Sequence, residues 1–341
     1  RDTFMALPGL LLSTGDLDTA REVIDSMVAR MENGLFPTTL TRSESSMYAA
    51  DAPLWFIWSL QQFQKYDPSV PIWKTYGGAV KSVLGVYREG TSGFIRMLDN
   101  GLIHASREGL ALTWMDSVVG DQPVTRRQGC PVEINALWYN AVVQSLEWAD
   151  GNDPAFTRSW SDLPEQIRNS CIENFWSEDR GYLADYTDGD FRDFSVRPNQ
   201  VIAVSVDHSP LGIEQKKSVL DIAESELLTP KGMRSLSPKN ENYRGTCEGD
   251  QEKRYRAYHQ GTAWPWLLEH FVKGYLDVHK KSGHTLVKRL YHGFEDALTV
   301  KAIGSISQAY DGNPPHEPRG AISHATSVAA LLRIGEMIDE F

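Results

Sequence analysis

Polar side chains of the kinds that bind sugars or transfer protons gather at the starts of apolar segments. They are carboxylates, amides, Arg, His and Trp, in six groups: Arg1-Asp2, Tyr48 to Asp51, Trp114 and Asp116 with Glu133 to Asn135, Arg197 to Gln200, Tyr258 to Gly261, and Gln308 to Arg319. This set suits a polyhydroxylated ligand, and two separated carboxyl groups suit hydrolysis of a glycosidic bond. Ordinary helix capping is the alternative, and it explains one such group more easily than six.

The sequence lacks the motifs of several other kinds of functional site. The sequence has no G-x-x-x-x-G-K-[ST], G-x-G-x-x-G, H-E-x-x-H or G-x-S-x-G, which are the signatures of nucleotide, zinc-protease and esterase sites. The 9 histidines show no metal spacing. The segment from Asp188 to Asp193 only faintly resembles a calcium loop, which favours a solvated turn. We therefore expect no metal ion and no other cofactor.

The amino-acid composition further narrows the class of protein. The 341 residues are 41% hydrophobic, and 34 Lys+Arg stand against 45 Asp+Glu, a net charge of −11. Such a chain has no basic surplus for binding nucleic acid. Its longest apolar run, Phe4–Leu12, contains Pro8 and Gly9 and is too short to cross a membrane. The 3 cysteines are scattered, which fits a reducing compartment, so we expect a cytoplasmic protein.

The elements that must position the polar groups are helices, because helical periodicity dominates and strand alternation is hard to find. One kind of helix is apolar on nearly every side and must lie inside the molecule; these span 3–13, 51–64, 133–147, 198–207, 259–277 and 321–338. A second kind alternates with the first and carries a single apolar stripe; these span 16–33, 73–88, 162–175, 211–227 and 284–300.

Inner helices that interleave with outer ones predict an all-α fold, an (α/α)6 toroid, as a single domain over 1–341. Parallel inner helices would open all their N-termini at one end, so the polar groups would converge on one funnel. An open helical solenoid is the alternative, but solenoids keep tighter periods and do not bury helices on every side. Because the chain opens on an inner helix at Arg1, we expect the last outer helix to precede it in a longer protein.

Several of these segments, in order along the whole chain, resemble the C-terminal glucosidase domain of glycogen debranching enzymes. The matching motifs are RDTFMALPGL (1–10), LTWMD (112–116), PVEINALWYN (131–140), RPNQ (197–200), YHQGTAWPW (258–266), GSIS (304–307) and DGNPPHEPRG (311–320). The resemblance implies a six-hairpin glycosidase-like barrel that acts as an inverting amylo-α-1,6-glucosidase without a metal. Its partner would be glycogen or a branched α-glucan oligosaccharide.

The resemblance also assigns roles to residues. Asp116 would be the general acid, and a carboxyl beside Trp114 at an apolar wall can hold its proton at neutral pH. Arg1 and Asp2 match a pair that grips the terminal glucose in glucoamylase-like relatives. Further hydrogen bonds to sugar are expected from Glu133, Asn135, Asn199, Gln200, His259 and Gln260, and stacking faces from Trp114, Trp138 and Trp264. Capping, for Asp116, and core packing, for the tryptophans, are the alternatives.

The general base departs from the pattern. Many relatives carry Glu after Gly-Ser-Ile-Ser, where this chain has Gln308. An amide can orient water but cannot take its proton, so either another carboxylate substitutes or the enzyme is impaired. We favour Glu317 over Asp311, because His316 and Arg319 could hold Glu317 ionised. The segment 322–327 also departs, since relatives often carry Ala-Gln-Ala-Trp-Ser there.

The sequence thus predicts removal of α-1,6-linked glucose from limit-dextrin-like branches. A glucoamylase- or trehalase-like hydrolase on the same barrel is the enzymatic alternative, because a fold does not fix a substrate. A catalytically impaired glucan-binding domain and a protein-interaction scaffold are the alternatives without chemistry.

Overall fold

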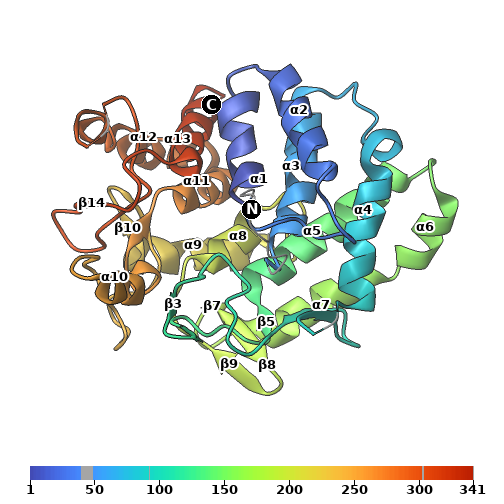
Figure 1. Ribbon diagram of the computed structural model, residues 1–341, viewed down its shortest axis with the longest axis horizontal. Helices are drawn as coiled ribbons and strands as arrows, with labels where there is room; N and C mark the ends of the chain where they lie inside the picture. Colours follow the sequence, from blue (N-terminus) through green and yellow to red (C-terminus); the bar gives the residue numbers. More distant parts are fainter. Residues whose placement is uncertain (40–48, 92, 302, 341) are drawn as a thin grey trace.

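The computed structural model describes residues 1–39, 49–91, 93–301 and 303–340. This part of the chain is rich in α-helix, with short strands between the helices (Figure 1). The prediction of a helix-rich domain is confirmed. Tyr48, which the sequence places in one of the polar groups, lies outside the described residues.

The predicted inner helices are present and largely buried. They are α1 (Asp2–Leu7), which continues into the π-helical segment η1 (Pro8–Leu12), α3 (Ala52–Tyr66), α5 (Val132–Ala149), α8 (Asn199–Ser205), α11 (Trp266–His279) and α13 (Ala325–Asp339). In α3 every side chain from Ala52 to Phe63 is buried, as an all-round apolar helix requires. These helices contact one another in chain order, and α13 also contacts α1.

The one-sided helices pack on the outside of the inner ones. They are α2 (Leu17–Val28), α4 (Ile72–Glu89), α7 (Leu163–Phe175), α9 (Ile213–Glu226) and α12 (His284–His292). In α2, Asp16 caps the helix by accepting from the Thr19 backbone N–H, and Ala20, Ile24 and Met27 form the buried stripe. Further short helical segments are α6 (Pro154–Trp160), α10 (Gln251–Tyr258), η2 (Lys280–Gly283) and η3 (Asp296–Thr299).

Two inner helices begin later than the sequence predicts. For 259–277, α11 starts only at Trp266, because Gly261 has a φ of 146° and the next residues form a strand. For 321–338, α13 starts at Ala325, after Gly320 with a φ of 71°. The residues in front of each helix are therefore loop and strand, which leaves their side chains free to face a cavity.

Short antiparallel strands, which the sequence did not predict, surround the helix ends. Strands of two or three residues are too short to show an alternating pattern. One sheet, in the order β10-β11-β12-β13-β14, joins β10 (Leu228–Thr229), β11 (Gly232–Arg234), β12 (Ala263–Trp264), β13 (Ala309–Tyr310) and β14 (Pro318–Arg319). The remaining strands are β1 (Ile95–Met97) with β2 (Ile103–Ala105), β3 (Val118–Val119) with β4 (Gln122–Pro123), β6 (Trp176–Ser177) with β7 (Tyr182–Leu183), and β5 (Cys130–Pro131) with β8 (Tyr186–Asp188) and β9 (Phe191–Asp193).

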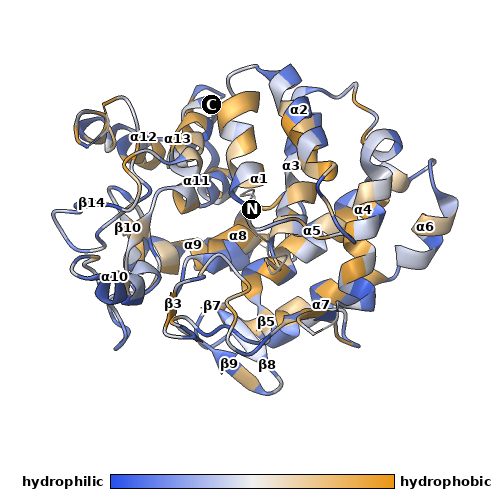
Figure 2. Cartoon of the chain, viewed as in Figure 1, coloured by the Kyte–Doolittle hydropathy of each residue, from blue (hydrophilic) through white to orange (hydrophobic). Residues whose placement is uncertain are grey.

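The core is one continuous cluster of apolar side chains that includes the largest aromatic rings. Trp55, Trp138 and Phe56 are each at most 1% exposed. Hydrophobic residues run along the helices, whereas α10 is almost wholly hydrophilic (Figure 2). Among the described residues, none of the helices combines the length and the apolar character needed to span a bilayer.

Candidate active site

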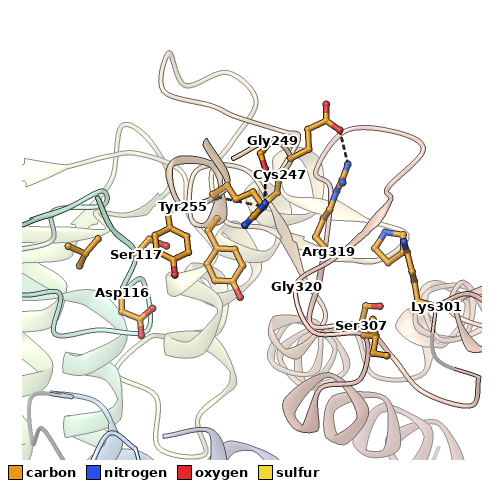
Figure 3. Close-up of a pocket in the computed structure, with 15 residues that line it drawn as sticks. Asp116, Ser117, Cys247, Gly249, Tyr255, Lys301, Ser307, Arg319 and Gly320 are labelled. Atoms are coloured by element: carbon orange, nitrogen blue, oxygen red, sulfur yellow. Dashed lines mark hydrogen bonds and ion pairs between the residues drawn. The ribbon is translucent and has the colours of Figure 1, made fainter. Parts of the chain in front are cut away.

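Two adjoining cavities share Asp116 and Tyr258 in their walls. The small cavity, of about 100 Å³, is lined by these two residues and by others that include Arg1, Asp2 and His324. The large cavity, of about 810 Å³, extends from Asp116 to the segment around Arg319. Figure 3 shows Asp116 on one side of the large cavity, with Ser307, Lys301 and Arg319 on the other.

The small cavity is assembled from segments far apart in the sequence. Arg1 and Asp2 stand at the start of α1, and His324 stands immediately before α13. The pairing of Ala263 with Tyr310 brings the strand of Trp264 beside the segment that follows Gln308. The sequence-predicted site residues that line this cavity are Arg1, Asp2, Trp114, Asp116, His259, Trp264 and Gln308.

Asp116 is the carboxyl with access to both cavities. Its side chain is 54% exposed, and its Oδ2 lies 3.4 Å from Nη1 of Arg1. The same guanidinium donates from Nε to Asp51 Oδ2 at 2.6 Å, which fixes its position. Burial raises the pKa of Asp116 above its ordinary value, while Arg1 acts in the opposite direction. A carboxyl whose pKa is raised and that faces a cavity is suited to act as an acid.

Aromatic rings form one wall of the small cavity. Trp114 meets the rings of His259, Trp264 and Trp266 edge-on, with centroid distances of 5.1, 5.4 and 5.1 Å. His259 Nδ1 lies 3.1 Å from Ser117 Oγ. Burial, and then the charge of Arg197, lower the pKa of His259 well below its ordinary value, so the ring is neutral near pH 7. The wall is therefore apolar and rigid, as suits one face of a sugar ring.

Several predicted sugar-binding residues lie instead in a buried ionic network below this wall. Arg127 donates from Nη2 to Glu133 Oε2 and from Nε to Asp185 Oδ2, both at 2.6 Å. Asp185 Oδ1 also accepts from Nδ2 of Asn199 at 2.7 Å. Glu133 is 1% exposed and Asn199 is 0% exposed, so neither side chain reaches the cavity. Their polar groups compensate buried charge rather than facing a ligand.

The remaining predicted binders are also engaged within the protein. Asn135 Oδ1 accepts the Ile103 backbone N–H at 2.7 Å, and Trp138 Nε1 donates to the Gly101 carbonyl at 3.1 Å. Asn135 and Trp138 thus satisfy polar backbone groups of the loop packed on α5. Gln200 Nε2 donates to the Arg197 carbonyl at 3.2 Å, and Gln260 Oε1 accepts from Nη2 of Arg197 at 2.9 Å. The predicted sugar-binding residues that do not line the small cavity are Glu133, Asn135, Trp138, Asn199, Gln200 and Gln260.

The structure separates the three residues considered for the base. Gln308 lines the small cavity, and its Oε1 accepts the backbone N–H of Ala321 at 3.0 Å. Asp311 is 4% exposed and forms an ion pair of 2.5 Å with Arg319. Glu317 lines a different cavity, near Lys231.

The preference for Glu317 as the base stays a prediction, and the position of Glu317 in a separate cavity does not support it. Asp311 and Glu317 belong to the β13–β14 hairpin, whereas Gln308 precedes it. Neither carboxylate shares a cavity with Asp116. In the described part of the chain, no three His, Cys, Asp or Glu side chains are grouped as metal ligands would be.

Sequence reasoning gave no individual role to Asp51 and did not name His324 or Thr326 as site residues. Asp51 positions Arg1, and the other two line the small cavity. Asp51 ends one of the polar groups, but it precedes the apolar helix α3 in the position of an ordinary cap, so its type did not reveal its partner. His324 and Thr326 did carry a signal, because they fall in the segment where the chain departs from its relatives.

A cavity with a carboxyl of raised pKa, a guanidinium and an aromatic wall, set among buried helices, is typical of glycoside hydrolases. The family model described as amylo-alpha-1,6-glucosidase matches residues 1–333 of this chain. The chain therefore belongs to the amylo-alpha-1,6-glucosidase family, as the sequence motifs indicated.

A curated relative agrees with this membership. The chain is 25% identical, over 379 aligned positions, to the glycogen debranching enzyme of Saccharomyces cerevisiae. The alignment includes 83% of this chain and 24% of the yeast protein. The chain thus corresponds to about a quarter of that relative's length.

Proposed function

We propose that this domain is an inverting glucosidase that removes α-1,6-linked glucose from limit-dextrin-like branches of a glycogen-type α-glucan. The observation that carries the proposal is Asp116, a carboxyl with a raised pKa that faces both cavities beside the guanidinium of Arg1. Family membership supports a glycoside-hydrolase reaction for such a carboxyl.

The proposed architecture is an (α/α)6 toroid that residues 1–341 form as one domain. Its support is the order of helix contacts: α1, α3, α5, α8, α11 and α13 touch in succession, and α13 returns to α1. An open solenoid would keep its first and last helices apart.

In the proposed reaction the terminal glucose occupies the small cavity and the rest of the glucan lies in the large one. Arg1 hydrogen-bonds to hydroxyl groups, and the Trp114 wall packs against the ring. Asp116 donates its proton to the glycosidic oxygen as the bond to the anomeric carbon breaks. Water attacks that carbon from the opposite face, so α-linked glucose leaves as β-glucose.

The anomer of the first product tests this reaction. The complete protein is mixed with an α-1,6-branched malto-oligosaccharide, and released glucose is followed by proton NMR before mutarotation equilibrates it. We expect β-glucose first. Initial release of α-glucose would contradict inversion, and absence of glucose would contradict hydrolysis. Parallel reactions with maltose-type and trehalose substrates separate the glucoamylase-like and trehalase-like alternatives.

One observation favours a second candidate, a glucan-binding domain with impaired chemistry. Gln308 lines the small cavity with Asp116, and its amide cannot deprotonate water. This candidate predicts that branched oligosaccharide binds, as measured by isothermal titration calorimetry, while the complete protein releases no glucose.

A further inference from the structure

Single-displacement hydrolysis needs a group that takes a proton from the attacking water. Among the described residues that line the small cavity, the titratable side chains besides Asp116 are Arg1, Asp2, Tyr258, His259 and His324. Arg1 and Tyr258 hold their protons: burial lowers the pKa of Arg1, but the carboxylates of Asp51 and Asp116 outweigh it and leave that pKa raised, and burial raises the pKa of Tyr258. His259 is part of the aromatic wall that adjoins Asp116, on the acid's own side. Asp2 and His324 remain.

These two residues face each other across a gap of defined size. His324 Nε2 lies 4.0 Å from Asp2 Oδ2, too far for a direct hydrogen bond. A water that donates one hydrogen bond of about 2.8 Å to each of two acceptors holds those acceptors about 4.4 Å apart. The gap therefore fits one water molecule that bridges the imidazole and the carboxylate.

The other ring nitrogen of His324 is already engaged. Its Nδ1 lies 2.9 Å from Thr326 Oγ1. When Nδ1–H donates to that hydroxyl, Nε2 is left with a free electron pair that points to the gap. Burial lowers the pKa of His324, and Asp2 opposes this effect, so the ring is neutral near pH 7 and its protonated form has a counter-charge beside it.

We propose that Asp2 and His324 hold the water that attacks the sugar, and that Nε2 of His324 accepts its proton. This inference rests on the proposed function and supplies the base for it. In this inference Asp2 hydrogen-bonds to the attacking water rather than to a hydroxyl group of glucose.

The step balances with the groups at hand. The water oxygen forms a bond to the anomeric carbon while the bond from that carbon to the glycosidic oxygen breaks. The leaving oxygen keeps the bonding pair and takes the proton of Asp116. One water proton passes to Nε2. The products are β-glucose, a glucan with a free 6-hydroxyl group, an Asp116 carboxylate and a His324 imidazolium, and solvent moves one proton from the imidazolium back to the carboxylate.

Burial of the ring and the charge of Asp2 set the pKa of His324, which shares the small cavity with other titratable groups. Asp2 and Arg1 approach from the start of α1, Asp116 from the β2–β3 connection, and Tyr258 and His259 from the end of α10. Protonation of His324 removes the base, so activity falls as the pH drops through its pKa.

The test compares His324→Gln and His324→Gly with wild type in the complete protein. We expect kcat on a branched oligosaccharide to fall about 10²- to 10⁴-fold, KM to change less than threefold, and the acidic limb of the pH profile to disappear. Azide needs no base to attack the anomeric carbon, so it should restore turnover in His324→Gly and form β-glucosyl azide. His292→Gln, at a surface histidine outside both cavities, is the matched control and should change nothing.

The outcomes separate this proposal from the proposed function. If wild type releases β-glucose and His324→Gln keeps more than half of its kcat, the base assignment is overturned and the function stands. A loss that azide does not restore, at an unchanged melting temperature, also overturns the assignment. If wild type releases no glucose and Gln308→Glu does, both proposals are overturned and the natural site is impaired.

Discussion

Trp114 Nε1 donates a hydrogen bond of 2.6 Å to Asn199 Oδ1, and this bond joins the cavity wall to the buried ionic network. Asn199 in turn donates to Asp185, which pairs with Arg127. The Trp114 side chain, which lines the small cavity, is thus held in place by a buried ionic network behind it.

Replacement of Arg127 should destabilise the whole domain. Arg127→Met would leave the buried carboxylate of Glu133 without its cation and Asp185 with only the longer ion pair to Arg197 at 3.7 Å. We expect the free energy of unfolding to fall by about 3–5 kcal/mol, measured by urea denaturation. Arg126→Met is the control, because the neighbouring Arg126 is exposed and donates to Gln122 on the surface. Equal effects of the two variants would contradict the structural role of the network.

Asp116→Asn should remove activity without removing the fold. The amide keeps the size of the carboxyl but cannot give a proton to the leaving oxygen. We expect kcat to fall about 10²- to 10⁴-fold, with the melting temperature within a few degrees of wild type. Asp121→Asn, at an exposed position nearby, should leave kcat unchanged. Retention of turnover in Asp116→Asn would refute its role as the acid.

The charge of Arg1 should set the alkaline limit of activity. Asp116 acts in its protonated form, so kcat/KM falls as the pH rises through its pKa. Arg1 lowers that pKa, and Arg1→Met removes this effect. The alkaline limb of the profile should therefore move to higher pH, in addition to any loss of sugar affinity. A limb that moves to lower pH would show that another group controls it.

Glu269 should make the fold less stable as the pH rises. It is buried 3.4 Å from Arg333, and burial raises its pKa from the ordinary 4.5 to about 7. Between these values the unfolded chain releases the proton and the folded chain retains it, so stability is lost with rising pH.

Glu269→Gln removes this titration. Relative to wild type, its free energy of unfolding should increase by about 3 kcal/mol between pH 4.5 and pH 7. Urea denaturation across this range measures the difference, and Glu340→Gln, at an exposed position, provides the baseline. A difference that does not vary with pH would show that Glu269 titrates normally in the folded protein.

Long apolar helices were predictable because burial on all sides leaves few polar residues in the pattern, as in α3, where the buried stretch has only Ser59, Gln61 and Gln62. The starts of α11 and α13 were not predictable. In each case the apolar run extends past the true start of the helix, and the sequence does not show that the nearby glycine has a positive φ. Strands of two or three residues were not predictable, because they are too short to show an alternating pattern.

For the site, residue type predicted chemistry better than it predicted position. Asp116 and Asn199 both belong to the polar groups that the sequence singles out, yet one is 54% exposed at a cavity and the other is 0% exposed in the network. The difference depends on which partners long-range packing supplies. Arg127, the cation that Glu133 and Asp185 share, comes from a loop whose place no local pattern reveals.

The contact between α1 and α13 has a consequence for biosynthesis. Asp2 is translated long before His324, so the gap between them closes only after the whole segment that joins them has been translated. Local helices can form earlier, but the loop closure that unites these two side chains spans almost the full sequence and carries its entropic cost at the end. A nascent chain that ends before His324 therefore lacks one wall of the small cavity, whatever helices it has already formed.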